Sequence, residues 1–327
     1  MLEFLTLITA SISFAQQSLL PSFQSVKTPV SIEKQIAPTP SKTNSDGFAI
    51  SHKSIVNETL NTIVADNIWQ TLNHLTSYPN RSATEQSGLD AAKWLKTTFE
   101  SMAIDYDRKD TKAFFVNTGW YKQPSLVTVI GKDLKSSAII IGAHMDTPDG
   151  KMPGADEGSG AAIIMEAARV LLESKTQFKH PIYIVWYGAG NRDFAGSQYV
   201  VQYFEDHLIP VKAVINLDKT GYRTHAEDAT MWVYNDFTDI KLTEYIRQLI
   251  KTYVHAPVDS STCNYKCSDH AIWNEQKISV GFSSESSLKE INPYIGTSSD
   301  TMDYLNLEHM TNFCKLALAF AIELASD

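Results

Sequence analysis

The chain has 327 residues, of which 43% are hydrophobic and 20% are charged, which is typical of a globular protein with one large core or two modest ones. Its formal net charge is −9 and no basic block occurs, so a nucleic-acid or anionic-membrane partner is not expected, because phosphate groups are bound by clustered lysine and arginine side chains. The sequence also contains no run of about 20 apolar residues, so it predicts no membrane-spanning segment.

The N-terminal stretch MLEFLTLITASISFA has an apolar run from Phe4 to Phe14, followed by Ala15. Such a run before a small residue resembles a secretory signal peptide cleaved after Ala15, although Glu3 stands where a Lys or Arg is usual. The alternative is a disordered tail that carries some apolar residues. The sequence therefore predicts a signal peptide over residues 1–15 and a secreted or periplasmic protein.

Residues 16–57 are rich in Ser, Thr, Pro, Gln and Lys and have neither helical nor strand periodicity. This composition predicts a disordered linker or pro-segment. The ordered domain is predicted to extend over residues 58–327. Since no internal repeat is visible, one domain is the simplest interpretation.

Helical and strand patterns alternate from residue 58 onward. Helices are predicted over residues 59–76, 87–103, 159–174, 197–206, about 238–253 and the C-terminus, and strands over 125–131, 138–146, 181–188, 211–218, 231–236 and 278–286. This alternation, with nearly continuous apolar strands, predicts an α/β fold with a single doubly wound, mostly parallel sheet flanked by helices. In such sheets the functional site lies at the carboxyl ends of the strands.

The chain has three cysteines, at positions 263, 267 and 314. Cys263 and Cys267 are spaced for either a small disulfide loop outside the cytoplasm or a pair of metal thiolates. Because no further Cys or His pair stands at zinc-finger spacing, a disulfide is the preferred interpretation. Cys314 lies in an apolar helical pattern and is predicted to be a core residue.

Polar side chains gather where the predicted strands end. His144 and Asp146 end one strand and point to the same face, Asp218 ends another, and Asp156 and Glu157 precede a helix. Each residue alone is explained as well by a structural role, such as a hydrogen-bonded histidine or an acidic helix cap. Together, a histidine and carboxylates at one sheet edge suit a divalent metal, with Asp146 orienting the metal-bound imidazole.

The strand over residues 181–188 ends differently. Its turn supplies Gly190 and Asn191, and the first acid is Asp193. Strand ends of this kind usually carry reactive side chains in α/β enzymes. The turn therefore raises the question of whether a reactive group has been lost.

Several motifs together resemble those of the M28 metallopeptidases. GAHMDT, PGADEGSG, INLDKTGY, CNYKCSDHA and NPYIGTSSDT occur in the order and spacing of that family, and in particular of its secreted bacterial leucyl aminopeptidases. The resemblance extends from about residue 58 to the C-terminus. It implies the removal of N-terminal residues from peptides or proteins by a two-zinc site. One zinc ion would be bound by His144 and Asp218, with Asp156 bridging to the second.

The same resemblance assigns a glutamate as general base, and a glutamate and a histidine as ligands of the second zinc. These positions fall on Gly190, Asn191 and Gly296, respectively. Loss of a general base costs about 10²–10⁴ in rate, and the lost ligands should abolish the second zinc. The expectation is therefore one zinc ion rather than two, with weak or absent hydrolysis.

Two further departures bear on the first zinc. The loop that carries Asp156 is one residue shorter than in many relatives, which would displace its carboxylate. Lys219 follows Asp218 where relatives commonly have an apolar residue. Its ammonium either faces solvent or replaces the charge of the metal cation. Glu157 is expected to be a solvated acid.

The resemblance places substrate contacts at Tyr265 and at two positions that are aromatic in leucine-preferring relatives, here Ser284 and Leu288. A pocket for a large apolar side chain is therefore less well supported. The alternative functions are a non-catalytic peptide-binding protein and, less favoured, a glutaminyl-cyclase-like acyltransferase. The cyclase would need two of the ligands that are absent. A monomer is expected.

Overall fold

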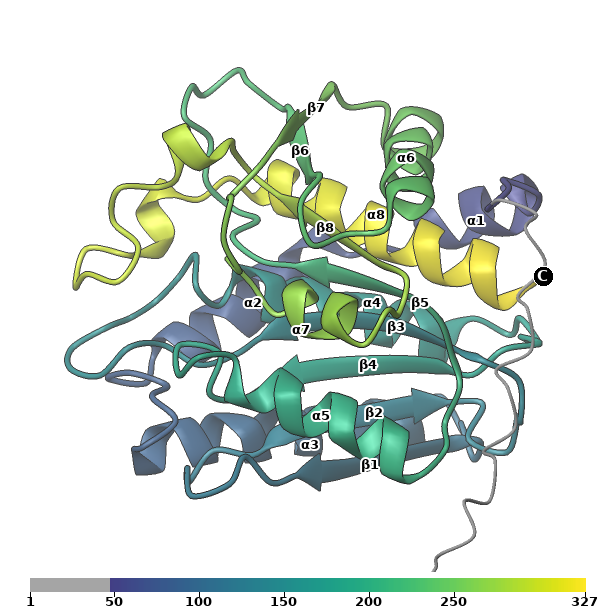
Figure 1. Cartoon of the computed structure of the whole chain (residues 1–327), viewed down its shortest axis with the longest axis horizontal. Coiled ribbons are helices and arrows are strands. Elements are labelled where there is room, and N and C mark those ends of the chain that lie inside the picture. The colour runs from purple at the N-terminus through teal and green to yellow at the C-terminus, as the bar shows by residue number, and fades with distance from the viewer. Residues whose placement is uncertain (1–47) are drawn as a thin grey trace, which may run out of the picture. The chain divides into compact units, whose positions relative to one another are not determined.

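The computed structural model describes residues 48–327 (Figure 1). The predicted signal peptide and most of the predicted linker lie outside the described residues. Helix α1 (Lys53–Leu60) begins five residues before the domain boundary predicted at residue 58. The predicted helix over residues 59–76 is divided between α1 and α2 (Ala65–Thr76), because the intervening Asn-Thr-Ile-Val has low helix propensity.

The described residues form one eight-stranded sheet in the order β1-β2-β4-β3-β5-β8-β6-β7. The strands are β1 (Thr111–Val116), β2 (Ser125–Ile130), β3 (Ala138–His144), β4 (Ile182–Tyr187), β5 (Val211–Leu217), β6 (Met231–Tyr234), β7 (Val258–Ser261) and β8 (Val280–Ser284). The other helices are α3 (Gln86–Asp105), α4 (Ser159–Glu173), α5 (Ala195–Asp206), α6 (Ile240–Leu249), α7 (His270–Glu275) and α8 (Leu307–Ala325), with short helical turns at Ile250–Val254, Leu288–Glu290 and Met302–Tyr304.

The four strands β4, β3, β5 and β8 run parallel, so their carboxyl ends meet at one edge of the sheet. On either side, β2 pairs antiparallel with β4, and β6 pairs antiparallel with β8. The predicted α/β class, with a sheet flanked by helices, is confirmed. The sheet is mixed, because only its central part and the β6–β7 pair are parallel.

Both faces of the sheet are buried, which explains the continuous apolar strands. In β3, Ile139 and Ile141 belong to the core formed with α2, α3, α4 and α8, whereas Ile140 belongs to a second core that includes residues of α5 and α7. Figure 1 shows α5 and α7 in front of the sheet. Among the helices of residues 48–327, none combines the length and apolar character that crossing a bilayer requires.

Glu323 of α8 connects the beginning of the domain to its end. Its Oε2 accepts hydrogen bonds from the backbone N–H groups of Ser51, at 2.8 Å, and His52, at 3.0 Å. The hydroxyl of Tyr253 donates to the other carboxylate oxygen of the same residue. Glu323 is fully buried, so these bonds fix the entry of the chain against the last helix.

Candidate active site

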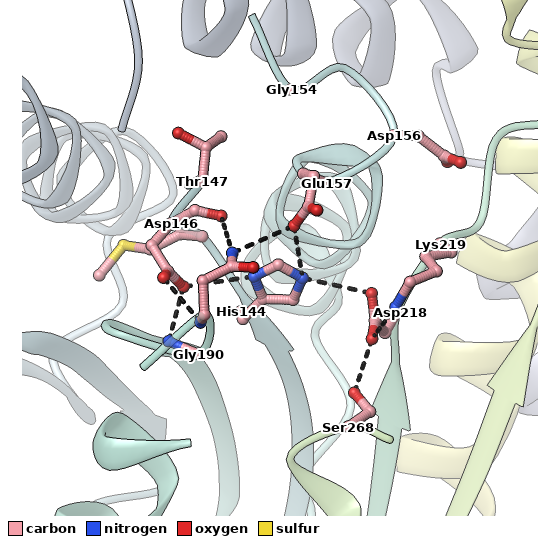
Figure 2. A network of polar contacts seen from close by, with 12 residues as sticks. His144, Asp146, Thr147, Gly154, Asp156, Glu157, Gly190, Asp218, Lys219 and Ser268 are labelled. Atoms are coloured by element: carbon pink, nitrogen blue, oxygen red, sulfur yellow. Dashed lines mark hydrogen bonds and ion pairs between the residues drawn. The ribbon is translucent and has the colours of Figure 1, made fainter. Parts of the chain in front are cut away.

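The parallel strands bring the predicted polar residues together at their carboxyl ends. His144 is the last residue of β3, Asp218 follows the end of β5, and the turn over residues 188–194 follows β4. Because β3 lies between β4 and β5, the residues that follow these two strands lie on either side of His144, as Figure 2 shows for Gly190 and Asp218.

The His144 imidazole lies among three carboxylates. Its Nδ1 is 3.3 Å from Oδ1 of Asp146, and its Nε2 is 3.2 Å from Oδ1 of Asp218 and 3.6 Å from Oε2 of Glu157. Only 7% of His144 is exposed. Burial alone would lower the pKa of the imidazole, but the nearby carboxylates outweigh burial and raise this pKa well above its usual value.

Asp146 is fully buried and holds the turn after β4 in place. Its carboxylate accepts hydrogen bonds from the backbone N–H groups of Gly190, at 2.7 Å, and Asn191, at 2.9 Å. A Cβ atom at Gly190 would lie 2.9 Å from Cβ of His144 and 3.0 Å from Oδ1 of Asp146. The predicted position of the general base is therefore closed to any side chain unless the turn moves.

Asp218 has partners at both carboxylate oxygens. Besides His144 at Oδ1, its Oδ2 accepts hydrogen bonds from Nζ of Lys219, at 2.6 Å, and from Oγ of Ser268, at 2.7 Å. Burial alone would raise the pKa of Asp218, but the cationic groups of Lys219 and His144 hold it well below its usual value. The Lys219 side chain is 21% exposed, so its ammonium faces Asp218 rather than bulk solvent.

Asp156 and Glu157 point in different directions. The Asp156 carboxylate accepts hydrogen bonds from Nδ2 of Asn292, at 3.0 Å, and from the backbone N–H of Gly221, at 3.2 Å. Figure 2 shows this carboxylate directed away from His144, with Glu157 beside the imidazole instead. The expected displacement of the Asp156 carboxylate is therefore seen, and Glu157, the next residue in the loop, lies beside His144 instead.

Glu157 is buried rather than solvated, with 7% of the residue exposed. Burial raises the pKa of its carboxyl group above the usual value. Nδ2 of Asn191 donates a hydrogen bond to its Oε2 at 3.2 Å. Asn191, which occupies a predicted ligand position of the second zinc, thus contacts the Glu157 carboxylate.

Two buried carboxyl groups behind Asp156 were not indicated by the sequence. Asp300 accepts a hydrogen bond from the backbone N–H of Asp156 at 2.9 Å, and burial raises its pKa to about 7. Glu285 accepts from the backbone N–H groups of Gly221, at 2.8 Å, and Tyr222, at 2.6 Å. Burial and the nearby Asp156 carboxylate raise the pKa of Glu285 well above its usual value. Asp300 thus holds the Asp156 loop, and Glu285 holds the segment after β5.

Arg81 is a further residue that the sequence did not single out. It is fully buried, and its guanidinium donates to the carbonyl oxygens of Met145 at 3.0 Å, Leu75 at 3.0 Å, Pro153 at 2.6 Å and Gly154 at 2.6 Å. Burial lowers its pKa to about 10. Arg81 therefore joins the segment after β3 to the loop that carries Asp156 and Glu157.

The remaining predicted positions lie around this network. Gly296, the predicted position of the lost histidine, has a φ of +70°, and a Cβ atom there would meet no heavy atom within 4 Å. Tyr265 is 56% exposed, in the loop closed by the disulfide between Cys263 and Cys267. The predicted disulfide is confirmed, and Cys314 is free and buried as expected.

Ser284 and Leu288 differ in their surroundings. Ser284 is buried at the end of β8, where its Oγ donates to the carbonyl oxygens of Asp218, at 2.8 Å, and Lys219, at 2.9 Å. Leu288 is partly buried, and its backbone N–H donates to Oγ of Ser261 at 3.1 Å. The Ser284 hydroxyl thus holds the Asp218–Lys219 backbone.

These contacts decide whether the site suits a metal. Within residues 48–327, no three His, Cys, Asp or Glu side chains are arranged to hold a metal ion. Nε2 of His144 is directed at Asp218, both oxygens of Asp218 have partners, and Asp156 is directed elsewhere. Since a ligand must present an unprotonated, unengaged donor atom, these residues as arranged do not fit a zinc ion.

Comparisons with known proteins identify similar chains. Residues 126–321 match the sequence profile of Peptidase family M28. The chain is 33% identical to leucine aminopeptidase 1 of Pyrenophora tritici-repentis over 306 residues. This aligned region covers 86% of this chain and 77% of that protein. It is 62% identical to the LapA aminopeptidase of Legionella pneumophila, with a TM-score of 0.86 and coverage of 88% of this chain and 78% of that one. The glutaminyl cyclase of Porphyromonas gingivalis shares the fold, at 16% identity and a TM-score of 0.64 over 80% of this chain and 99% of that one.

Proposed function

Because the chain belongs to peptidase family M28, we propose that it is an aminopeptidase homologue that binds the N-terminal ends of peptides and hydrolyses them weakly or not at all. The observation that carries this proposal is the turn after β4. There, Gly190 and Asn191 donate their backbone N–H groups to Asp146, and Gly190 offers no side chain as a base.

Hydrolysis of a peptide bond needs a group that accepts a proton from the attacking water and a group that polarises the carbonyl. Glu157 lies 3.6 Å from the predicted metal-binding histidine and could accept a proton, but Asn191 and His144 already contact it. Loss of the general base alone lowers the rate by about 10²–10⁴. A zinc ion, which the resemblance implies, has no part in this proposal, because the donor atoms do not fit one.

We expect the purified protein to hydrolyse aminoacyl-p-nitroanilides at least about 10²-fold more slowly than an active M28 aminopeptidase, because the general base is missing. Release of nitroaniline measures this rate. The control is His144→Ala, which should leave any residual rate unchanged if that rate comes from a contaminant. Turnover at the rate of the active enzyme that vanishes in His144→Ala would contradict the proposal.

Binding without turnover is measured separately. A fluorescent peptide with a free N-terminus should bind to the wild-type protein, and the same peptide with an acetylated N-terminus should bind more weakly, because acetylation removes the ammonium charge. Equal binding of the two peptides would show that the N-terminus is not the group recognised.

We also propose that the protein is exported. The apolar run before Ala15 and the disulfide between Cys263 and Cys267 support this proposal, because disulfides persist mainly outside the cytoplasm. Expression of the full chain in a bacterium should yield extracytoplasmic protein whose N-terminal residue is Gln16, as read by N-terminal sequencing. Retention in the cytoplasm with residues 1–15 intact would contradict export.

A further inference from the structure

The ammonium of Lys219 pairs with Asp218, one of the predicted metal ligands. It is 2.6 Å from Oδ2 of Asp218, and Oδ1 of the same carboxylate is 3.2 Å from Nε2 of His144 (Figure 2). Asp218 and His144 end neighbouring parallel strands, β5 and β3. The carboxylate that connects the two strand ends thus contacts a lysine ammonium as well as the His144 imidazole.

We propose that the Lys219 ammonium replaces the metal ion of this site: it supplies the positive charge that the converging carboxylates need, and it keeps zinc from binding. This inference rests on the proposed function in that it concerns the same site.

The first argument is electrostatic. Asp146, Glu157 and Asp218 all lie within 3.6 Å of the His144 ring nitrogens, and each of these residues is at least nine-tenths buried. Carboxylates that share a buried site repel each other unless cations lie nearby, and a metal ion is the usual cation in such sites. Here the Lys219 ammonium donates to the Asp218 carboxylate, whereas the Asp146 carboxylate accepts hydrogen bonds from backbone N–H groups.

The second argument concerns the spacing of the donor atoms. Nε2 of His144 lies 3.2 Å from Oδ1 of Asp218 and 3.6 Å from Oε2 of Glu157. In a tetrahedral zinc site with bonds of about 2.0–2.1 Å, neighbouring ligand atoms lie about 3.3 Å apart. Each of these two distances from His144 is close to that spacing, although the three side chains as arranged do not form a metal site. The ammonium on Asp218 opposes a metal ion at this carboxylate, because Lys219 and a divalent cation would repel each other.

The test compares four proteins. Wild type, Lys219→Met, Lys219→Arg and the control Lys212→Met are equilibrated with zinc chloride, dialysed against metal-free buffer and measured for zinc per chain by elemental analysis. Lys212 suits the control because it pairs with Asp327, outside the site. We expect about one zinc ion per chain in Lys219→Met and no stoichiometric zinc in the other three. Stoichiometric zinc in the wild type, or none in folded Lys219→Met, overturns the proposal.

If Lys219→Met does not fold, the wild type can still overturn the proposal. Its melting temperature should not change on addition of zinc or a chelator, because ligands that bind only the native state stabilise it. A rise with zinc and a fall with chelator overturn the proposal. The metal readout is independent of anilide turnover: rapid turnover would refute the proposed function, whereas a metal-free wild type would still support Lys219 as the replacement cation.

Discussion

Replacing Arg81 by methionine is expected to lower the free energy of unfolding by about 4 kcal/mol or more, or to prevent folding. The guanidinium donates to four backbone carbonyl oxygens on three segments of the chain and is fully buried. Methionine fills part of the volume but donates no hydrogen bond. Each buried carbonyl left without a partner costs about 1–3 kcal/mol, although such costs do not add fully.

Urea denaturation followed by far-ultraviolet circular dichroism measures this change. The matched control is Arg192→Met, because the Arg192 side chain is 30% exposed and pairs with the surface residue Asp149. That substitution should cost less than about 1 kcal/mol. Equal costs for the two variants would show that the buried hydrogen bonds of Arg81 do not hold these segments together.

Replacing Asp146 by alanine is expected to destabilise the protein by about 3–5 kcal/mol. The carboxylate accepts from two backbone N–H groups of the turn after β4 and contacts Nδ1 of His144. Alanine would leave these donors without an acceptor, and those of Gly190 and His144 are buried. It would also free the turn, so exchange of the Gly190 amide hydrogen should become faster than in the wild type.

Asp149 offers the comparison for this prediction, because it lies three residues later in the same loop and its side chain is 56% exposed. Asp149→Ala should cost less than about 1 kcal/mol, although Asp149 also pairs with Arg192. Melting temperatures and urea midpoints of the two variants provide the measurement. If Asp146→Ala is as stable as Asp149→Ala, the buried carboxylate is not what fixes the turn.

Most of the sheet follows from the sequence because its central strands are buried on both faces. β3, β4 and β5 read as continuous apolar runs, and their predicted bounds differ from the observed ones by only one or two residues. The predictions missed β1 and β7, which lie at the two edges of the sheet and each pair with one neighbour. β7 has the sequence VDSS, in which polar residues leave no strand periodicity.

The candidate site is predictable to the extent that strand ends define it. His144, Asp146 and Asp218 come together because β3 and β5 are neighbours in the sheet. No rule of periodicity decides which of two adjacent acids, Asp156 or Glu157, faces the imidazole. That choice depends on contacts from distant segments, such as those of Asn292 and Asp300, which only the folded chain brings near.

The structural role of Arg81 could not be predicted from the sequence either. Its partners are backbone carbonyl oxygens, which every residue carries, so no sequence motif marks them. Lys219 differs, because an ammonium next to a predicted metal ligand is visible in the sequence. The ion pair with Asp218 shows that this ammonium faces the carboxylate rather than solvent.

The attachment of Ser51 and His52 to Glu323 has a consequence for any proteolytic trimming of the N-terminus. Proteolytic trimming anywhere before residue 48 leaves both backbone donors in place, so a shortened chain keeps the connection to α8. Trimming beyond His52 would leave the buried Glu323 carboxylate with Tyr253 as its remaining partner in the described residues. The fold thus sets a limit, near residue 50, to how far a processing protease can shorten the chain without loosening its last helix.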